Sequence, residues 1–142
     1  MNDNNERRVV SVIVVNEASV LSRITDLFSG RGYNITSLTV APIPESKYSR
    51  LTIVTSGSVR VIEQITKQLH KLIPVLRVYE HEDLVEKEMA MIKFPASENI
   101  ADISTLCEVY NGKIVNVGEN VIIVMVADEP KRIDNFLKII KR

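Results

Sequence analysis

Two kinds of hydrophobic spacing alternate along the chain. Residues Arg8 to Val15 are almost continuously valine and isoleucine, which predicts a strand covered on at least one face. From Val20 the apolar residues fall on one side of a helix, and Gly30 and Gly32 end that helix. A short polar turn, Asn16 to Ser19, therefore joins a buried strand to an amphipathic helix.

The following elements complete a first unit. Residues rich in β-branched side chains predict two strands over 35–41 and 50–56, joined by a loop that contains two prolines. Ser58 is the expected N-cap of a second helix, and Pro74 closes that helix ahead of a strand over 75–79. The order strand, helix, strand, strand, helix, strand is that of a ferredoxin-like unit, an antiparallel sheet with both helices on one face.

The same order begins again after the polar run Glu80 to Asp83. A strand, a helix, two strands joined by a short turn and a helix opened by Pro130 follow one another. The predicted fold class is α+β, with tandem ferredoxin-like βαββαβ units over residues 1–81 and 82–142. The second unit lacks its last strand.

Composition narrows the classes of function. The 142 residues are 45% hydrophobic and 25% charged, enough for one domain or two small ones with modest cores. Eighteen basic residues balance eighteen acidic ones, so no excess positive charge favours nucleic acid. The start "MNDNNERR" holds no signal-peptide core, and no apolar run reaches the roughly 18 residues of a membrane helix. We therefore expect a cytoplasmic protein that contacts neither nucleic acid nor membrane.

The chain offers little catalytic equipment. His70 and His81 fall on different predicted elements, and neither has a second histidine or a cysteine at metal-ligand spacing. The single cysteine, Cys107, lies on the apolar side of a predicted helix, which indicates a buried thiol. The "GRG" at 30–32 follows a helix, whereas a dinucleotide-binding loop follows a strand. The residues indicate no catalytic site and no metal site.

The turn Asn16 to Ser19 is the best candidate for a binding site. It precedes a predicted helix, whose first N–H groups lack intrahelical partners and whose dipole is positive at this end, so it suits a carboxylate. The alternative is ordinary capping, in which Asn16 or Ser19 accepts a hydrogen bond from the first turn. Capping is the commoner use of these residue types, and the pattern alone leaves both interpretations open.

Two stretches resemble a known family, the regulatory small subunits of acetolactate synthase, also called acetohydroxyacid synthase. They are "NEASVLSRITDLFSGRGYNITSLTVAPIPESKYSRLTIVTSG" and "VIEQITKQLHKLIPVLRV". The resemblance implies that the first unit is an ACT domain, a ferredoxin-like module that binds small effectors, and that the second is a related unit. Chains of this family continue past the last helix with a further strand, whereas this sequence ends at "FLKIIKR". We therefore expect the second unit to be the less stable half.

The resemblance implies a non-catalytic chain without a cofactor of its own. In this family the partner is a catalytic large subunit, which carries thiamine diphosphate, magnesium and FAD and makes precursors of valine, leucine and isoleucine. The small subunit raises that activity and confers feedback inhibition by valine. The resemblance also implies a homodimer in which the ACT domains pair edge to edge, with the effector between the protomers.

Carried over position by position, the resemblance implies an effector site shared by two protomers. Its residues are Asn16, Ala18, Ser19, Val20 and Leu21 of one protomer, and Asn34 and Ile35 of the other. Helix N-terminal amides hold the effector's carboxylate, and the asparagine side-chain carbonyls accept from its ammonium group. The valine, leucine and isoleucine offer apolar surface to a branched side chain.

One residue departs from the family's pattern, since Ser19 stands where glycine is usual. Glycine permits a positive φ and close approach of a ligand, whereas serine restricts both. We therefore expect a site that survives with a weaker or altered effector preference.

Two alternative functions remain open. One is a different ACT-type amino-acid sensor, which shares the turn and the fold but serves another partner enzyme. The other is an RNA-binding module with the same order of elements, which needs stacking aromatics and a basic face on its sheet. The chain has no tryptophan, three phenylalanines and four tyrosines, so its composition disfavours RNA binding.

Overall fold

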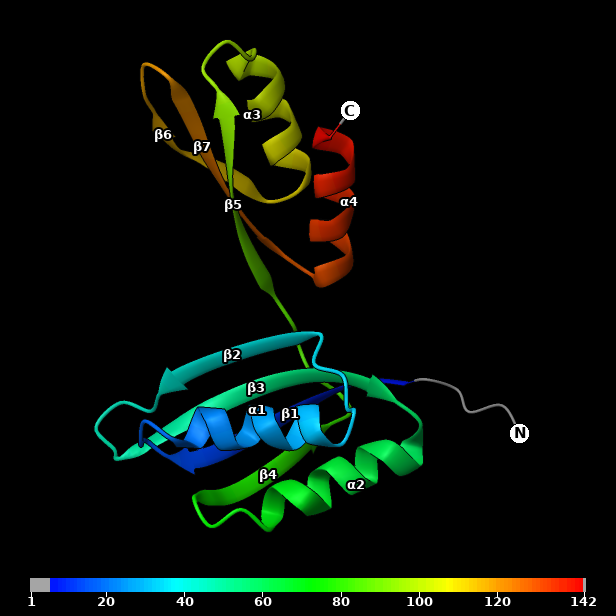
Figure 1. Ribbon diagram of the computed structural model, residues 1–142. Coiled ribbons are helices and arrows are strands. Elements are labelled where there is room, and N and C mark those ends of the chain that lie inside the picture. The colour runs from blue at the N-terminus through cyan, green and yellow to red at the C-terminus, as the bar shows by residue number, and fades with distance from the viewer. Residues whose placement is uncertain (1–5, 142) are drawn as a thin grey trace. The chain divides into compact units, whose positions relative to one another are not determined.

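The computed structural model describes residues 6–141. Its contacts divide the chain into two compact units, the first ending at Leu84 and the second beginning at Val85 (Figure 1). Each unit has its own antiparallel sheet and its own hydrophobic core. The predicted fold class, α+β with two ferredoxin-like units, is confirmed.

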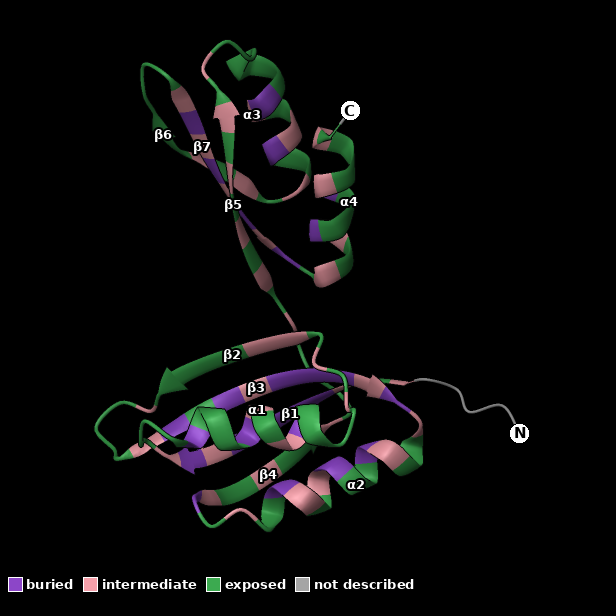
Figure 2. Ribbon diagram, viewed as in Figure 1, coloured by how far each residue is buried: buried purple, intermediate pink, exposed green. Residues whose placement is uncertain are grey.

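The first unit is a four-stranded sheet of order β2-β3-β1-β4 with both helices on one face (Figure 1). Its elements are β1 Glu6–Val15, α1 Val20–Gly30, β2 Ser37–Pro42, β3 Tyr48–Gly57, α2 Val59–His70 and β4 Val75–His81. β1 and β3 are the most buried strands of this sheet, and much of both is purple in Figure 2. Their alternate residues pack in one cluster with residues of the two helices. The buried core comprises Val10, Val12, Val14, Val20, Ile24, Phe28, Leu51, Ile53, Ile62, Ile65 and Leu69.

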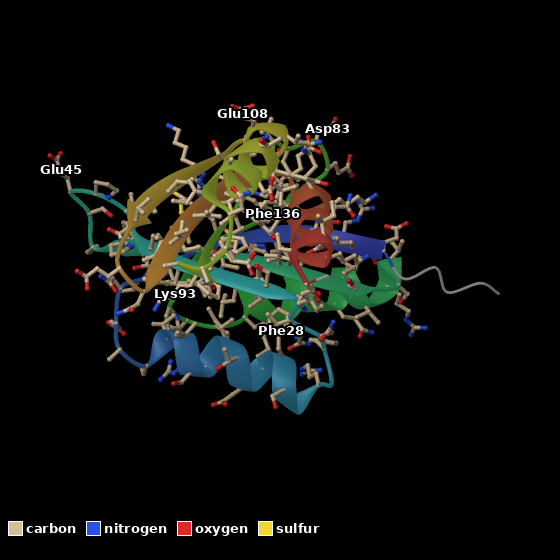
Figure 3. The ribbon with its side chains drawn as sticks, turned by 90° about the horizontal axis from the view of Figure 1, so that it is seen from above. Phe28, Glu45, Asp83, Lys93, Glu108 and Phe136 are labelled. Carbon is tan, nitrogen blue, oxygen red and sulfur yellow. The ribbon has the colours of Figure 1, made fainter. Side chains whose placement is uncertain are left out.

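The second unit has a three-stranded sheet of order β5-β7-β6. Its elements are β5 Glu88–Pro95, α3 Ile100–Val109, β6 Gly112–Val117, β7 Val121–Asp128 and α4 Pro130–Ile140. The described residues of this unit contribute three strands to the sheet. The buried core comprises Ile103, Cys107, Ile122, Val124, Val126, Ile133 and Phe136. Figure 3 labels Phe28 and Phe136, the large aromatic side chains of the two cores.

A buried carboxylate ties the end of β7 to its surroundings in the second unit. Asp128 is 3% exposed and accepts hydrogen bonds from Arg132 Nε at 2.5 Å, the Glu129 amide at 2.8 Å and Asn111 Nδ2 at 3.2 Å. Lys87 Nζ lies 3.4 Å from the same carboxylate. The hydrogen bond from Arg132, followed by the bond from the Glu129 amide, holds the pKa of Asp128 well below its usual range.

Several strand limits differ from the sequence-based expectation, and those of β4 and β2 change the interpretation of the sequence. β4 runs to His81 rather than to residue 79, because Glu80 and His81 pair with β1. In addition, Glu80 Oε1 lies 3.4 Å from Arg8 Nε. The polar run that looked like a linker is therefore partly strand. β2 begins at Ser37, so Ile35 lies before the strand instead of within it. β1 and β3 are also longer than expected, over 6–15 and 48–57, because their ends pair with each other. In each place the pairing partner, rather than local composition, sets the limit.

Candidate functional site

The turn that follows β1 leaves amide groups open at the start of α1. The Asn16 amide donates to Lys47 O at 2.9 Å, and the Val20 amide donates to Glu17 O at 3.3 Å. Among the described residues, the amides of Leu21 and Ser22 have no recorded acceptor. The first turn of this helix therefore presents free donors at the positive end of its dipole.

Side-chain capping does not close these donors. Ser19 is the N-cap residue of α1, but it makes no side-chain cap hydrogen bond, and the first turn contains no acidic residue. Its backbone is helical, with φ −87° and ψ −10°, whereas Ser58 and Asn99, which do cap α2 and α3, are extended. An N-cap side chain reaches the amides of the first turn from the extended conformation. The capping interpretation is therefore wrong for this helix.

The backbone at Ser19 also bears on its departure from the family pattern. A φ of −87° suits any residue, so no glycine is needed there for backbone freedom. The Ser19 side chain is exposed and is not part of the cavity wall described next. Neither the backbone nor the cavity wall therefore supports the expectation that this serine alters the effector preference, and the affinity of Ser19→Gly tests it.

A cavity of about 200 Å³ opens beside the start of α1. It is lined by Val14, Val15, Asn16, Glu17, Val20, Leu21, Val40, Ser49 and Leu51, which come from β1, the turn, α1, β2 and β3. Most of these side chains are aliphatic. The cavity therefore combines an apolar wall with the uncapped end of a helix, an arrangement suited to a small molecule with an acidic group and an aliphatic part.

Of the predicted site residues in the turn and α1, three line the cavity and two do not. Asn16, Val20 and Leu21 line the cavity. Ala18 and Ser19 are exposed on the turn and lie outside the cavity wall.

The other two predicted residues lie at the opposite end of the sheet. Asn34 and Ile35 precede β2, whose first residue Ser37 pairs with Val54, whereas the cavity is next to Ser49 on the same β3 strand. The five residue steps from Ser49 to Val54 span about 17 Å at the usual rise of a strand. A single protomer does not bring Asn34 to the cavity, so a site that includes it needs a second copy.

Five lining residues outside the predicted turn and helix escaped the sequence analysis. Val14, Val15, Val40 and Leu51 looked like ordinary apolar strand positions, and Ser49 looked like a polar residue in a loop next to a strand. The register places Ser49 opposite Val14, on the face that the helices cover. Only the pairing of three strands reveals that this serine lies in the cavity.

The remaining candidate groups form no second site. His70 is exposed at the end of α2, and His81 Nε2 lies 2.8 Å from Ser11 Oγ. Cys107 is 3% exposed, and burial raises the pKa of its thiol. Within residues 6–141, no group of three histidine, cysteine, aspartate or glutamate side chains is arranged to hold a metal ion. None of the described helices is long and apolar enough to cross a membrane.

Comparison with known proteins identifies the family. A model described as an AHAS small subunit-like ACT domain matches residues 10–77, and one described as the small subunit of acetolactate synthase matches residues 87–142. The chain belongs to the acetolactate synthase small-subunit family. This assignment agrees with the resemblance seen in the sequence and leaves no ground for the RNA-binding alternative.

Relatives in this family match almost the whole chain. The acetolactate synthase isozyme 3 small subunit of Escherichia coli is 44% identical over 95% of this chain and 85% of its own length. The acetolactate synthase small subunit of Methanothermobacter thermautotrophicus is 34% identical over 96% and 83%, respectively. The crystal structure of the Thermotoga maritima small subunit superposes with a TM-score of 0.87 at 34% identity, covering 94% of this chain and 86% of that one. The first unit is thus an ACT domain of the small-subunit type.

Proposed function

We propose that this chain is the regulatory subunit of an acetolactate synthase, which activates a catalytic large subunit and makes it sensitive to valine. One observation carries the proposal: an aliphatic cavity lies against the uncapped N-terminus of α1. An α-amino acid with a branched aliphatic side chain has the two groups that such a cavity accommodates. The names of the relatives supply the enzyme with which the chain works.

The effector's groups are matched by different parts of the cavity. Its carboxylate takes hydrogen bonds from the free amides of Leu21 and Ser22, at the positive end of the helix dipole. The Asn16 side-chain carbonyl accepts from its ammonium group. The aliphatic side chain packs against Val20 and Val40, where each methylene separates competing amino acids by about 1–3 kcal/mol.

The proposed site spans a homodimer formed by the ACT domains. β2 is an edge strand of the described sheet, and its Val40 is 43% exposed. An antiparallel pairing of β2 with β2 of a second copy brings the Ser37 end of one strand beside the Pro42 end of the other. The partner's Asn34 and Ile35 then approach the cavity. This pairing also covers an otherwise open sheet edge.

The proposed chain performs no chemistry itself. Thiamine diphosphate, magnesium and FAD belong to the catalytic subunit in this proposal, and the small subunit contributes only a binding equilibrium. Since effector binding changes the affinity for the catalytic subunit, binding of that subunit changes the effector's affinity by the same factor.

Mixing two inactive variants tests the shared site. Asn16→Ala and Asn34→Ala homodimers each have two defective sites and bind valine weakly in calorimetry. After unfolding and refolding together, half of the dimers are mixed, and each mixed dimer holds one site with both asparagines. Recovery of strong sites in the mixture supports a site between protomers, whereas no recovery, with dimers intact by light scattering, contradicts it.

Reconstitution distinguishes the proposal from another ACT-type sensor with a different partner enzyme. The chain is added to an acetolactate synthase catalytic subunit, and acetolactate formation is measured with and without valine. Activation that valine reverses supports the proposal. Valine binding without any activation favours the other sensor.

A further inference from the structure

One buried polar side chain of the first unit makes no hydrogen bond to another described residue. The buried polar or charged side chains of the described residues are Ser11, Ser49, Thr55 and Asp128. Ser11 contacts His81 Nε2 at 2.8 Å, Thr55 Oγ1 donates to Asn34 O at 2.5 Å, and Asp128 accepts several bonds. Ser49 is only 4% exposed, and its hydroxyl makes no hydrogen bond to another of residues 6–141. A hydroxyl in this position takes its hydrogen bonds from water or from a ligand.

The hydroxyl lies where a ligand reaches it. Ser49 lines the cavity beside α1, and its register partner Val14 belongs to the core under the helices. No side-chain nitrogen or oxygen that is sealed from solvent lacks a partner in the described residues, so the Ser49 oxygen faces the cavity. The cavity thus holds a solvent-accessible hydroxyl inside a largely apolar wall.

The groups around this hydroxyl define what it binds. The amides of Leu21 and Ser22 are donors without acceptors, and Ser49 supplies a third donor beside the same helix end. Leu21 and Ser49 both line the cavity, and donors on one cavity wall match a group with several acceptor oxygens and a negative charge. We propose that the Ser49 hydroxyl donates a hydrogen bond to the effector's carboxylate, next to the first-turn amides of α1. This inference rests on the proposed amino-acid effector.

The assignment has a consequence for specificity. The carboxylate is common to all α-amino acids, so Ser49 raises the affinity for each of them and does not rank their side chains. Ranking falls to the aliphatic residues of the wall, such as Val40 and Leu51. A role at the effector's side chain predicts the opposite, a changed ranking when the hydroxyl is removed.

A comparison of two ligands on three proteins tests the contact. L-valine and L-valinamide, which lacks the carboxylate charge, are titrated into the full-length wild type, Ser49→Ala and Ser11→Ala by calorimetry. Ser11 is an equally buried serine of the same sheet, but its hydroxyl has a partner and lies outside the cavity. We expect Ser49→Ala to weaken valine about tenfold, as for a bond to a charged group, and valinamide by threefold or less. Ser11→Ala leaves both affinities unchanged.

Each other outcome is decisive. Wild-type valine affinity in Ser49→Ala overturns the contact and leaves the proposed function intact. Equal weakening of both ligands, with unchanged thermal unfolding, places Ser49 away from the carboxylate and also overturns it. Failure of the wild type to bind valine overturns the inference together with the effector on which it rests. Ser49→Cys, which keeps the volume but donates weakly, loses affinity as Ser49→Ala does if the hydrogen bond is the cause.

Discussion

The N-terminal amides of two equivalent helices, α1 in the first unit and α3 in the second, are satisfied differently. α1 and α3 each follow the first strand of a unit. In α3, Asn99 Oδ1 accepts from the Ala101 amide at 2.9 Å, and Asp102 lies in the first turn. In α1, Ser19 makes no such bond and no acidic residue is present. The second unit closes its helix with its own side chains, and the first leaves the helix open beside a cavity.

This difference between α1 and α3 shows that the shared fold alone does not produce the candidate binding site. The topology is repeated, but a side-chain cap contributes about 0.5–2 kcal/mol of stability, and the first unit lacks that contribution at α1. The open donors become useful only when a ligand with a carboxylate arrives. The residues at the N-cap and in the first turn decide whether the amides of a helix end are satisfied within the protein or stay available to a ligand.

The first unit, whose helix α1 is uncapped, is nevertheless expected to be the more stable of the two. The buried cluster of the first unit holds 11 residues and that of the second holds 7, which favours the first unit in buried apolar surface. The second unit also depends on Asp128, the one buried carboxylate among the described residues. We therefore expect the unit without the cavity to be the first to open.

Removal of the central aromatic of each core gives the largest effect. Phe136→Ala in the second unit and Phe28→Ala in the first, each replacing a side chain at most 1% exposed, are expected to cost about 3–5 kcal/mol. Phe136→Ala abolishes the protection of amides from hydrogen exchange in the second unit and leaves that of the first, because the second core is the smaller. Hydrogen exchange read by mass spectrometry reports each unit separately. Equal protection of both units in the wild type would contradict the ranking.

Acid is expected to open the second unit first. The native pKa of Asp128 is lowered, so its charge stabilises the folded state above the unfolded pKa of about 3.9, and this stability is lost as the pH falls toward the native value. Asp128→Asn therefore removes the acid dependence of unfolding below about pH 4 and lowers stability at neutral pH. Denaturant unfolding across this pH range measures both effects. Asp134→Asn, at an exposed position of α4, serves as the matched control and should change neither.

Closing α1 in the manner of α3 is expected to weaken effector binding. Ser22 occupies the third helical position of α1, as Asp102 does in α3, so Ser22→Asp reproduces the acidic residue of the α3 end. The new carboxylate competes for the free amides and repels that of the effector, so valine affinity falls at least about tenfold while stability rises by about 0.3–1 kcal/mol. Ser22→Asn is the neutral control. Unchanged valine affinity in Ser22→Asp would sink the role of the helix end.

The order and type of the elements were predictable because each depends on nearby residues. Val20 starts a helix, Ser58 caps the next one through the Val61 amide, and Pro130 occupies the first turn of α4. These signals act within one turn of helix or one strand. The limits of β2 and β4 were not predictable, because they depend on hydrogen bonds to strands that are distant in the sequence.

The candidate site was only partly predictable for the same reason. The polar turn after a buried strand singled out Asn16, and the helix pattern singled out Val20 and Leu21. The open state of the helix end depends on the backbone angles of Ser19, which residue type does not determine. Ser49 enters the cavity through the register of three strands, so no local pattern marks it.

The smallest expected effect concerns the residue that departs from the family pattern. Because Ser19 has an ordinary φ and an exposed side chain outside the cavity wall, Ser19→Gly is expected to change valine affinity by less than about threefold and stability by a few tenths of a kcal/mol. Calorimetry at a protomer concentration that keeps any dimer intact measures the first quantity. A large gain in affinity would mean that the serine obstructs the effector in a dimer. The difference between α1 and α3 would then depend on the side chain at the N-cap rather than on the open amides behind it.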